Sequence, residues 1–142
     1  MPKSSAQIQS REETEALLRR FLGLKDFILL NESRSEGEQG PAVIAERNNM
    51  KYFFEVIGAK KDGASRTMDF KNAFCQAISR LNGKSNEKAV IAMPEVFFYN
   101  GMQARVKRFG EYAWMKIGQV FDIELWFISP QGIEESKWNE YL

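Results

Sequence analysis

The strongest constraint on the fold is a helical apolar stripe that lies between two strand-like segments. KYFFEVIG, residues 51–58, precedes this helix, and the apolar segment KAVIAMP, residues 88–94, follows it. A continuous apolar strand after a helix is typical of a buried parallel strand. The pattern therefore predicts a strand–helix–strand crossover within an α/β protein. The stripe consists of Phe70, Ala73, Phe74, Ala77, Ile78 and Leu81, which recur at helical spacing.

Local signals place the other elements around this crossover. Ser10 and Glu13 have the spacing of a capping box, and Asn48-Asn49 suits a tight hairpin turn because asparagine tolerates positive φ. The loop AKKDGASR is expected to extend to Arg66, and the tail from Gln131 either forms a helical turn or packs loosely. The predicted elements are a helix at about 10–22, a strand at 25–32, hairpin arms at 42–47 and 51–58, a helix ending before Gly83, a strand at 88–94, a helix at about 100–118 with a break near Gly110, and a strand at 122–129.

This order, α-β-β-β-α-β-α-β, predicts a central mixed β-sheet of about five strands flanked by helices. At 142 residues the chain is expected to form a single domain at 10–142 after a disordered N-terminus at 1–9. A single cysteine, Cys75, suits a reducing compartment and is expected to be a packed thiol. No segment has the length of a signal peptide or of a membrane span of ~20 apolar residues, so the expected location is cytoplasmic with no membrane partner.

The sequence contains no histidine. This absence removes the Ser-His-Asp triad, the Cys-His dyad and the usual proton shuttle near neutral pH. It also removes most zinc sites, so oxygen ligands would have to hold any metal. Such a set of ligands favours Mg²⁺, Mn²⁺ or Ca²⁺.

Positive charge is concentrated in the middle of the chain. Residues 60–116 contain eleven Lys or Arg and five acidic residues, a net charge of +6, whereas the rest of the chain carries −5. Such asymmetry suits an anionic partner, DNA or RNA, or else reflects solvated helix faces. Nearby aromatic residues strengthen the nucleic-acid reading, although Val106 and Phe109 also fit an ordinary core stripe. The candidate nucleic-acid-binding residues are Arg66, Arg80, Arg105, Lys107 and Arg108.

Several landmarks together resemble the PD-(D/E)XK nuclease superfamily, which has the restriction-endonuclease-like fold. Pro41-Ala42 opens the first hairpin arm, and Glu55-Val56-Ile57 occupies the acid-x-Lys position of the next strand. Gln76 lies on the following helix, as a polar residue does in that family. The late strands KAVIAMP and DIELWFI complete a resemblance that covers about 15–130.

The resemblance implies a degenerate active site. In the family, two carboxylates bind divalent ions that activate water, and the lysine stabilises negative charge. Here Ala42 stands at the aspartate position and Ile57 at the lysine position, so Glu55 alone remains. The expected remnant site consists of Glu55, Gln76 and Lys71, the last as a lysine that reaches back from the helix. Glu55 would bind Mg²⁺ or Mn²⁺ only if the protein were active.

Three functions follow as alternatives. The first is a catalytically inactive nuclease-fold protein that binds nucleic acid or a protein partner, a second copy included, through a basic surface. The second is an active metal-dependent nuclease whose ligands have migrated, for example to Glu12, Glu13 or Glu15. The third is a structural or assembly protein without nucleic-acid contact. In that case Glu55 belongs to a buried polar cluster with Lys71, Arg66 or Gln76, and Gln76 caps one end of the sheet.

Overall fold

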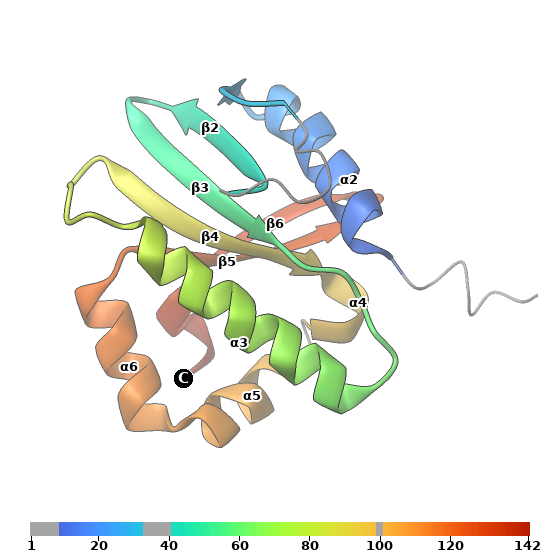
Figure 1. The fold of residues 1–142 in the computed structure, drawn as a ribbon, viewed down its shortest axis with the longest axis vertical. Coiled ribbons are helices and arrows are strands. Elements are labelled where there is room, and N and C mark those ends of the chain that lie inside the picture. Colours follow the sequence, from blue (N-terminus) through green and yellow to red (C-terminus); the bar gives the residue numbers. More distant parts are fainter. Residues whose placement is uncertain (1–8, 33–40, 99–100) are drawn as a thin grey trace, which may run out of the picture.

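The fold is a six-stranded mixed sheet between two helical layers (Figure 1). The computed structural model describes residues 9–32, 41–98 and 101–142. The elements are α2 (Arg11–Leu24), β1 (Ile28–Leu29), β2 (Val43–Arg47), β3 (Met50–Val56), α3 (Gly63–Arg80), β4 (Glu87–Pro94), α4 (Glu95–Phe98), α5 (Met102–Phe109), α6 (Glu111–Val120), β5 (Ile123–Ser129), β6 (Gly132–Lys137) and a final 3₁₀ turn, η2 (Trp138–Tyr141).

The strands lie in the sheet in the order in which they occur along the chain, β1-β2-β3-β4-β5-β6. The first three form an antiparallel meander, with Val43 opposite Phe54. β3, β4 and β5 are parallel, so a helical crossover precedes β4 and another precedes β5. β6 returns antiparallel to β5. The predicted α/β class and mixed sheet with flanking helices are therefore confirmed.

Side chains alternate between two apolar cores, one on each face of the sheet. On β4, Val90 and Ala92 point to the side of α2, whereas Ile91 and Met93 point to the side of α3. The α2 side is filled mainly by Leu18, Leu22, Phe27, Tyr52, Phe54, Trp126 and Ile128. The other side is filled by residues of α3, α5, α6 and η2, including Phe70, Met102, Val106, Trp114 and Trp138, together with Leu125 and Phe127 of β5. Figure 1 shows α2 apart from the other long helices, with the sheet between them.

Three local features that the sequence predicts are present in the structure. The Ser10 hydroxyl accepts the Glu13 N–H at 3.0 Å, and the Glu13 carboxylate accepts the Ser10 N–H at 2.8 Å, which completes the capping box. Asn48 and Asn49 both have positive φ, 54° and 65°, at the β2–β3 turn. The break at Gly110, with φ of 113°, separates α5 from α6.

Three boundaries differ from the prediction. The strand count is six rather than about five, because part of the tail forms β6 before the 3₁₀ turn. α3 begins at Gly63, inside the predicted loop, because Asp62 caps it by accepting the Ser65 N–H at 3.1 Å. β1 covers only two residues of the predicted strand.

The predicted disordered N-terminus, 1–9, lies outside the described residues except for Gln9. The Gln9 backbone carbonyl accepts a hydrogen bond of 2.8 Å from the Ala59 N–H. Over the described ranges, no helix is both long and apolar enough to span a membrane.

Candidate functional site

Glu55 projects from β3 towards α3, and its charge is compensated there by an arginine. Its neighbours Phe54 and Val56 belong to the core on the α2 side, so strand alternation turns Glu55 to the opposite face. Only 6% of Glu55 is exposed, and its Oε2 accepts a hydrogen bond of 2.9 Å from Nε of Arg80. Burial of a carboxylate is unfavourable unless a cation accompanies it, and Arg80 meets that requirement.

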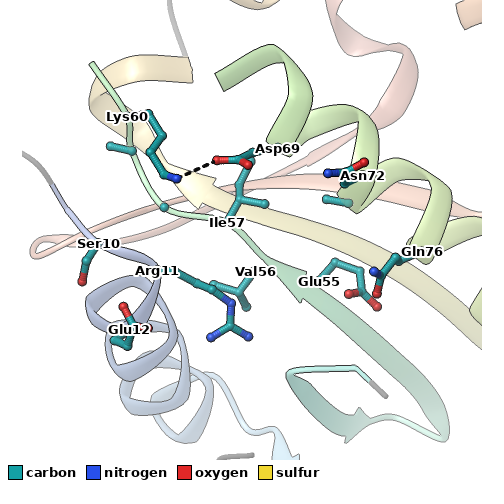
Figure 2. Close-up of a pocket in the computed structure, with 13 residues that line it drawn as sticks. Ser10, Arg11, Glu12, Glu55, Val56, Ile57, Lys60, Asp69, Asn72 and Gln76 are labelled. Carbon is teal, nitrogen blue, oxygen red and sulfur yellow. Dashed lines mark ion pairs between the residues drawn. The ribbon is translucent and has the colours of Figure 1, made fainter. Parts of the chain in front are cut away.

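Gln76 belongs to the same cluster of polar side chains. It lies one helical turn before Arg80 on α3, and its Oε1 accepts a hydrogen bond of 3.2 Å from Nη2 of Arg80. Figure 2 shows Gln76 beside Glu55. Arg80 thus bridges the two residues that carry the resemblance on β3 and α3.

This cluster lies at one end of a polar cavity of about 510 Å³ (Figure 2). The cavity is bounded by the start of α2, the end of β3 with the residues that follow it, and the middle of α3. At its other end Lys60 forms an ion pair with Asp69 at 3.5 Å. The lining residues are Ser10, Arg11, Glu12, Glu55, Val56, Ile57, Gly58, Ala59, Lys60, Asp69, Asn72, Ala73 and Gln76.

Gly58 allows α2 to approach β3 closely at this cavity. A Cβ atom built on Gly58 would lie 2.4 Å from the backbone nitrogen of Arg11 and 2.9 Å from the carbonyl carbon of Ser10. Both atoms belong to the backbone, so a larger side chain would have to move the helix. The wall of the cavity therefore depends on glycine at this position.

The acidic residues do not come together as ligands for a metal ion. Among the described residues, no group of three or more His, Cys, Asp or Glu could hold one. Glu15, a predicted migrated ligand, contacts Arg11 at 3.5 Å and Arg19 at 3.0 Å instead. Glu13 serves in the capping box. The residues present therefore do not fit the divalent-ion site that the resemblance implies.

The two positions at which the resemblance would require Asp and Lys are occupied by buried apolar residues, Ala42 and Ile57. Ala42 is 1% exposed and Ile57 is 8% exposed. The Ala42 N–H donates to the carbonyl of Phe54 at 3.1 Å, so Ala42 lies next to the strand position of Glu55. The Ala42 carbonyl in turn accepts a hydrogen bond from Nη2 of Arg19 at 2.9 Å.

Lys71 does not join Glu55, contrary to the sequence prediction. It lines a second cavity, of about 500 Å³, between α3 and α5. Arg105 and Arg108 enter this cavity from α5, so three cationic side chains border one space. We call it the basic cavity; its lining residues are Ala64, Thr67, Met68, Phe70, Lys71, Arg105, Arg108 and Phe109.

Arg105 is the buried cation of the basic cavity. Only 8% of the residue is exposed, and its guanidinium carbon lies 4.8 Å from the centre of the Phe70 ring. Burial, together with the positive charges of Arg108 and Arg66, lowers the pKa of Arg105 to about 10. Arg105 still carries its charge at neutral pH. Burial is the main cause of the lowered pKa, and repulsion by Arg108 and Arg66 adds to it; a bound anion would relieve this repulsion.

The other predicted nucleic-acid-binding residues occupy different places. Arg66 donates hydrogen bonds to the backbone carbonyls of Lys60 and Lys61 at 2.7 and 2.8 Å. Its positive charge is close enough to Arg105 to lower the pKa of that residue. Arg80 lies at the polar cavity with Glu55. Lys107 is exposed on α5, outside the lining of the basic cavity. Of the predicted set, Arg105 and Arg108 line the basic cavity, whereas Arg66, Arg80 and Lys107 lie outside the linings of both cavities.

The lining of the basic cavity includes two residues that the sequence did not mark as candidates, Thr67 and Met68, beside Phe70 of the apolar stripe. Helical spacing is the signal that would have found it. Thr67, Phe70 and Lys71 fall at i, i+3 and i+4, and so do Arg105, Arg108 and Phe109. Each triplet therefore presents one face of a helix, and the fold brings the two faces together.

Comparison with known proteins identifies no relative of this chain. No family model matches the chain, and neither a curated protein nor a solved structure matches it. The fold and its two cavities define the chain as an α/β protein with a mixed six-stranded sheet, an ion-paired carboxylate on β3 and a basic cavity between α3 and α5.

Proposed function

We propose that this protein is a catalytically inactive member of the restriction-endonuclease-like class that binds nucleic acid through the basic cavity. The arrangement of the sheet supports the class. A meander, β1 to β3, leads through α3 into the parallel strand β4, which is the order that the resemblance implies. The proximity of Glu55 on β3 and Gln76 on α3, which Arg80 bridges, also supports the class.

The contact between Arg80 and Glu55 supports the loss of catalysis. A metal-binding carboxylate has to offer its oxygens to a divalent cation, whereas one oxygen of Glu55 accepts a hydrogen bond from a guanidinium at 2.9 Å. A metal ion at Glu55 would have to compete with this permanent positive charge. Of the other two carboxylates on the lining of the polar cavity, Asp69 pairs with Lys60 and Glu12 lies at the start of α2; in the described ranges these residues do not form a group that could hold a metal ion.

The observation that carries the binding role is the convergence of Lys71, Arg105 and Arg108 on one cavity, with the charge of Arg66 within reach. Cations from two helices that face a common space provide the electrostatic part of phosphate recognition. Arg is well suited to this role because its planar guanidinium can donate two parallel hydrogen bonds to a phosphate. Phe109 and Met68 add an apolar wall for a base or sugar.

The test is fluorescence anisotropy with labelled single-stranded DNA, duplex DNA, branched DNA and single-stranded RNA at two salt concentrations. We expect binding that weakens as salt increases, since each phosphate contact releases bound cations. Arg108→Ala should weaken binding on the order of tenfold, the usual effect of one charge-assisted hydrogen bond. Lys84→Ala is the matched control, because it removes one exposed positive charge away from both cavities.

The same samples, incubated with Mn²⁺ and run on a denaturing gel, test for catalysis. Intact nucleic acid supports an inactive binding protein. Cleavage that Glu55→Ala abolishes would establish the active nuclease instead. Failure to bind any of the four probes would overturn the nucleic-acid role and favour a structural or assembly protein.

A further inference from the structure

The shape of the basic cavity restricts which part of a nucleic acid can enter it. Its volume of about 500 Å³ is that of a small-molecule pocket, and its lining comes from the two helices α3 and α5. A double helix is too wide to enter such a space. A group that protrudes from a strand, such as an end or an unpaired nucleotide, can enter it.

The charge at the cavity favours a dianion over a monoanion. Three cationic side chains line the space, and Arg105 among them is 8% exposed. An internal phosphodiester carries one negative charge, whereas a terminal phosphate carries about −1.5 to −2 at neutral pH, as phosphorylated side chains do. The terminal group also offers three acceptor oxygens to the donors of Arg105, Arg108 and Lys71.

The position of the cations relative to the apolar wall also suits a nucleotide at a strand end. Arg105 packs over Phe70, which fixes the guanidinium against a ring that itself belongs to the core. Phe109 lines the same cavity, and its contacts with Phe74 and Trp114, at 5.6 and 5.2 Å between ring centres, hold its ring in place. A phosphate bound by the cations would leave its nucleoside next to Phe109 and Met68.

We infer that the basic cavity binds the terminal phosphate of a single-stranded nucleic acid. This inference rests on the proposed nucleic-acid-binding function and names the part of the ligand that occupies the cavity. Arg105, Arg108 and Lys71 bind the phosphate, and the apolar wall receives the terminal nucleoside. Internal phosphates contribute through the remaining basic surface of α3 and α5.

The experiment compares oligonucleotides of one sequence that differ only at their ends. Single strands that carry a 5′-phosphate, a 3′-phosphate or hydroxyls at both ends are titrated with the full-length protein by fluorescence anisotropy. We expect one phosphorylated strand to bind on the order of tenfold more tightly than the hydroxyl strand, the equivalent of one additional hydrogen bond between charged groups. Lys71→Ala and Arg108→Ala should each reduce this ratio, whereas Lys84→Ala should preserve it.

The pH dependence separates phosphate recognition from a general structural effect of these variants. The second proton of a phosphate monoester leaves at a pKa near 6, whereas the cations remain charged up to a pKa of about 10 at Arg105. The preference for the phosphorylated strand should therefore decrease as the pH falls from 7.5 to 5.5.

The possible failures are distinguishable. Equal binding of all three strands overturns this inference and leaves the proposed function intact. A preference that survives in the double variant Lys71→Ala, Arg108→Ala also overturns it, because the phosphate would then bind elsewhere. If none of the strands binds, the proposed function fails and the inference fails with it.

Discussion

Arg80 on the last turn of α3 donates its Nε hydrogen to Glu55 on β3 at 2.9 Å, which fixes the end of the crossover helix to the middle of the sheet. Glu55 has 9% of its side chain exposed and Arg80 has 23%. The burial of this pair is therefore intermediate. A surface ion pair contributes little to stability, whereas breaking a fully buried pair is strongly destabilising. Its energetic role can be measured directly.

Arg80→Met should destabilise the protein by about 2–3 kcal/mol, because it leaves the Glu55 carboxylate buried without its cation. For a chain of this size the melting temperature should fall by roughly 6–10 °C. The double variant Glu55→Met, Arg80→Met should regain most of the loss, since it removes both charges and keeps the volume. Thermal unfolding of the wild type, Arg80→Met, Glu55→Met and the double variant forms a double-mutant cycle. Equal stability of Arg80→Met and the wild type would contradict a stabilising role of the pair.

Gly58→Ala should destabilise the fold by about 3 kcal/mol, at the upper end of the range for overpacking, because the new Cβ would meet backbone atoms of α2. The clash distance of 2.4 Å to the Arg11 nitrogen requires the helix to shift. Gly23→Ala is the control: no atom lies within 4 Å of its Cβ position, and alanine in a helix should stabilise by about 0.5–1 kcal/mol. Both variants are unfolded with urea. Equal unfolding midpoints would refute the close approach of the α2 backbone to Gly58.

Arg105→Met should stabilise the free protein and weaken nucleic-acid binding at the same time. Removal of a buried cation that two other arginines repel should gain about 1–3 kcal/mol, partly offset by the loss of the interactions of Arg105, the contact with Phe70 among them. Such an exchange of stability for binding is typical of residues retained for function. A variant that is less stable than wild type would show that Arg105 is a structural residue.

The pH dependence of that difference follows from the lowered pKa of Arg105. Because the folded-state pKa of Arg105, about 10, is lower than that of an arginine in the unfolded chain, folding disfavours its charged form. The penalty is constant below pH 10, where Arg105 is charged in both states. Above pH 10 the folded state releases its proton before the unfolded state does, so the penalty decreases as the pH rises further. The stability gain of Arg105→Met should thus be the same at pH 6 and pH 9; a gain that changes over this interval would mean that another group is involved.

Trp138→Phe should cost about 1–2 kcal/mol through loss of a buried hydrogen bond. Trp114 and Trp138 each donate an indole N–H to the backbone carbonyl of the other at 2.8 Å, and their rings stack with centres 3.8 Å apart. Trp138→Ala should cost about 3–5 kcal/mol, because it also leaves a large cavity. Near-ultraviolet circular dichroism should lose the signal of the stacked pair in both variants, and an unchanged spectrum would argue against the stacking.

Sequence patterns predicted the elements with strong local signals. The Ser10–Glu13 box, the Asn48-Asn49 turn and the apolar strand at 88–94 all appear in the structure. Such signals act between neighbours in the chain. The strand β6 was not predicted because its segment, GIEESK, is polar and largely exposed, and only pairing with β5 makes it a strand.

The division of the candidate site into two cavities could have been predicted in part. Lys71 and Gln76 are five residues apart, which places them about 140° apart around a helix, so they cannot face the same site. Gln76 and Arg80 are four residues apart and share a face, as their hydrogen bond of 3.2 Å requires. What periodicity could not supply is the placement of α5 beside α3, because that depends on packing between distant parts of the chain.

The six strands lie in the sheet in the same order as in the chain, and this has a consequence for folding during synthesis. Every new strand joins the edge left by the one before it, from β1 to β6, and no strand has to insert between two strands that have already paired. The sheet can therefore be extended in the direction of synthesis as the chain leaves the ribosome. The α3 side of the sheet is sealed only when Trp138 emerges, so a ribosome that stalls before this codon holds a nascent chain with an exposed apolar surface, which chaperones recognise.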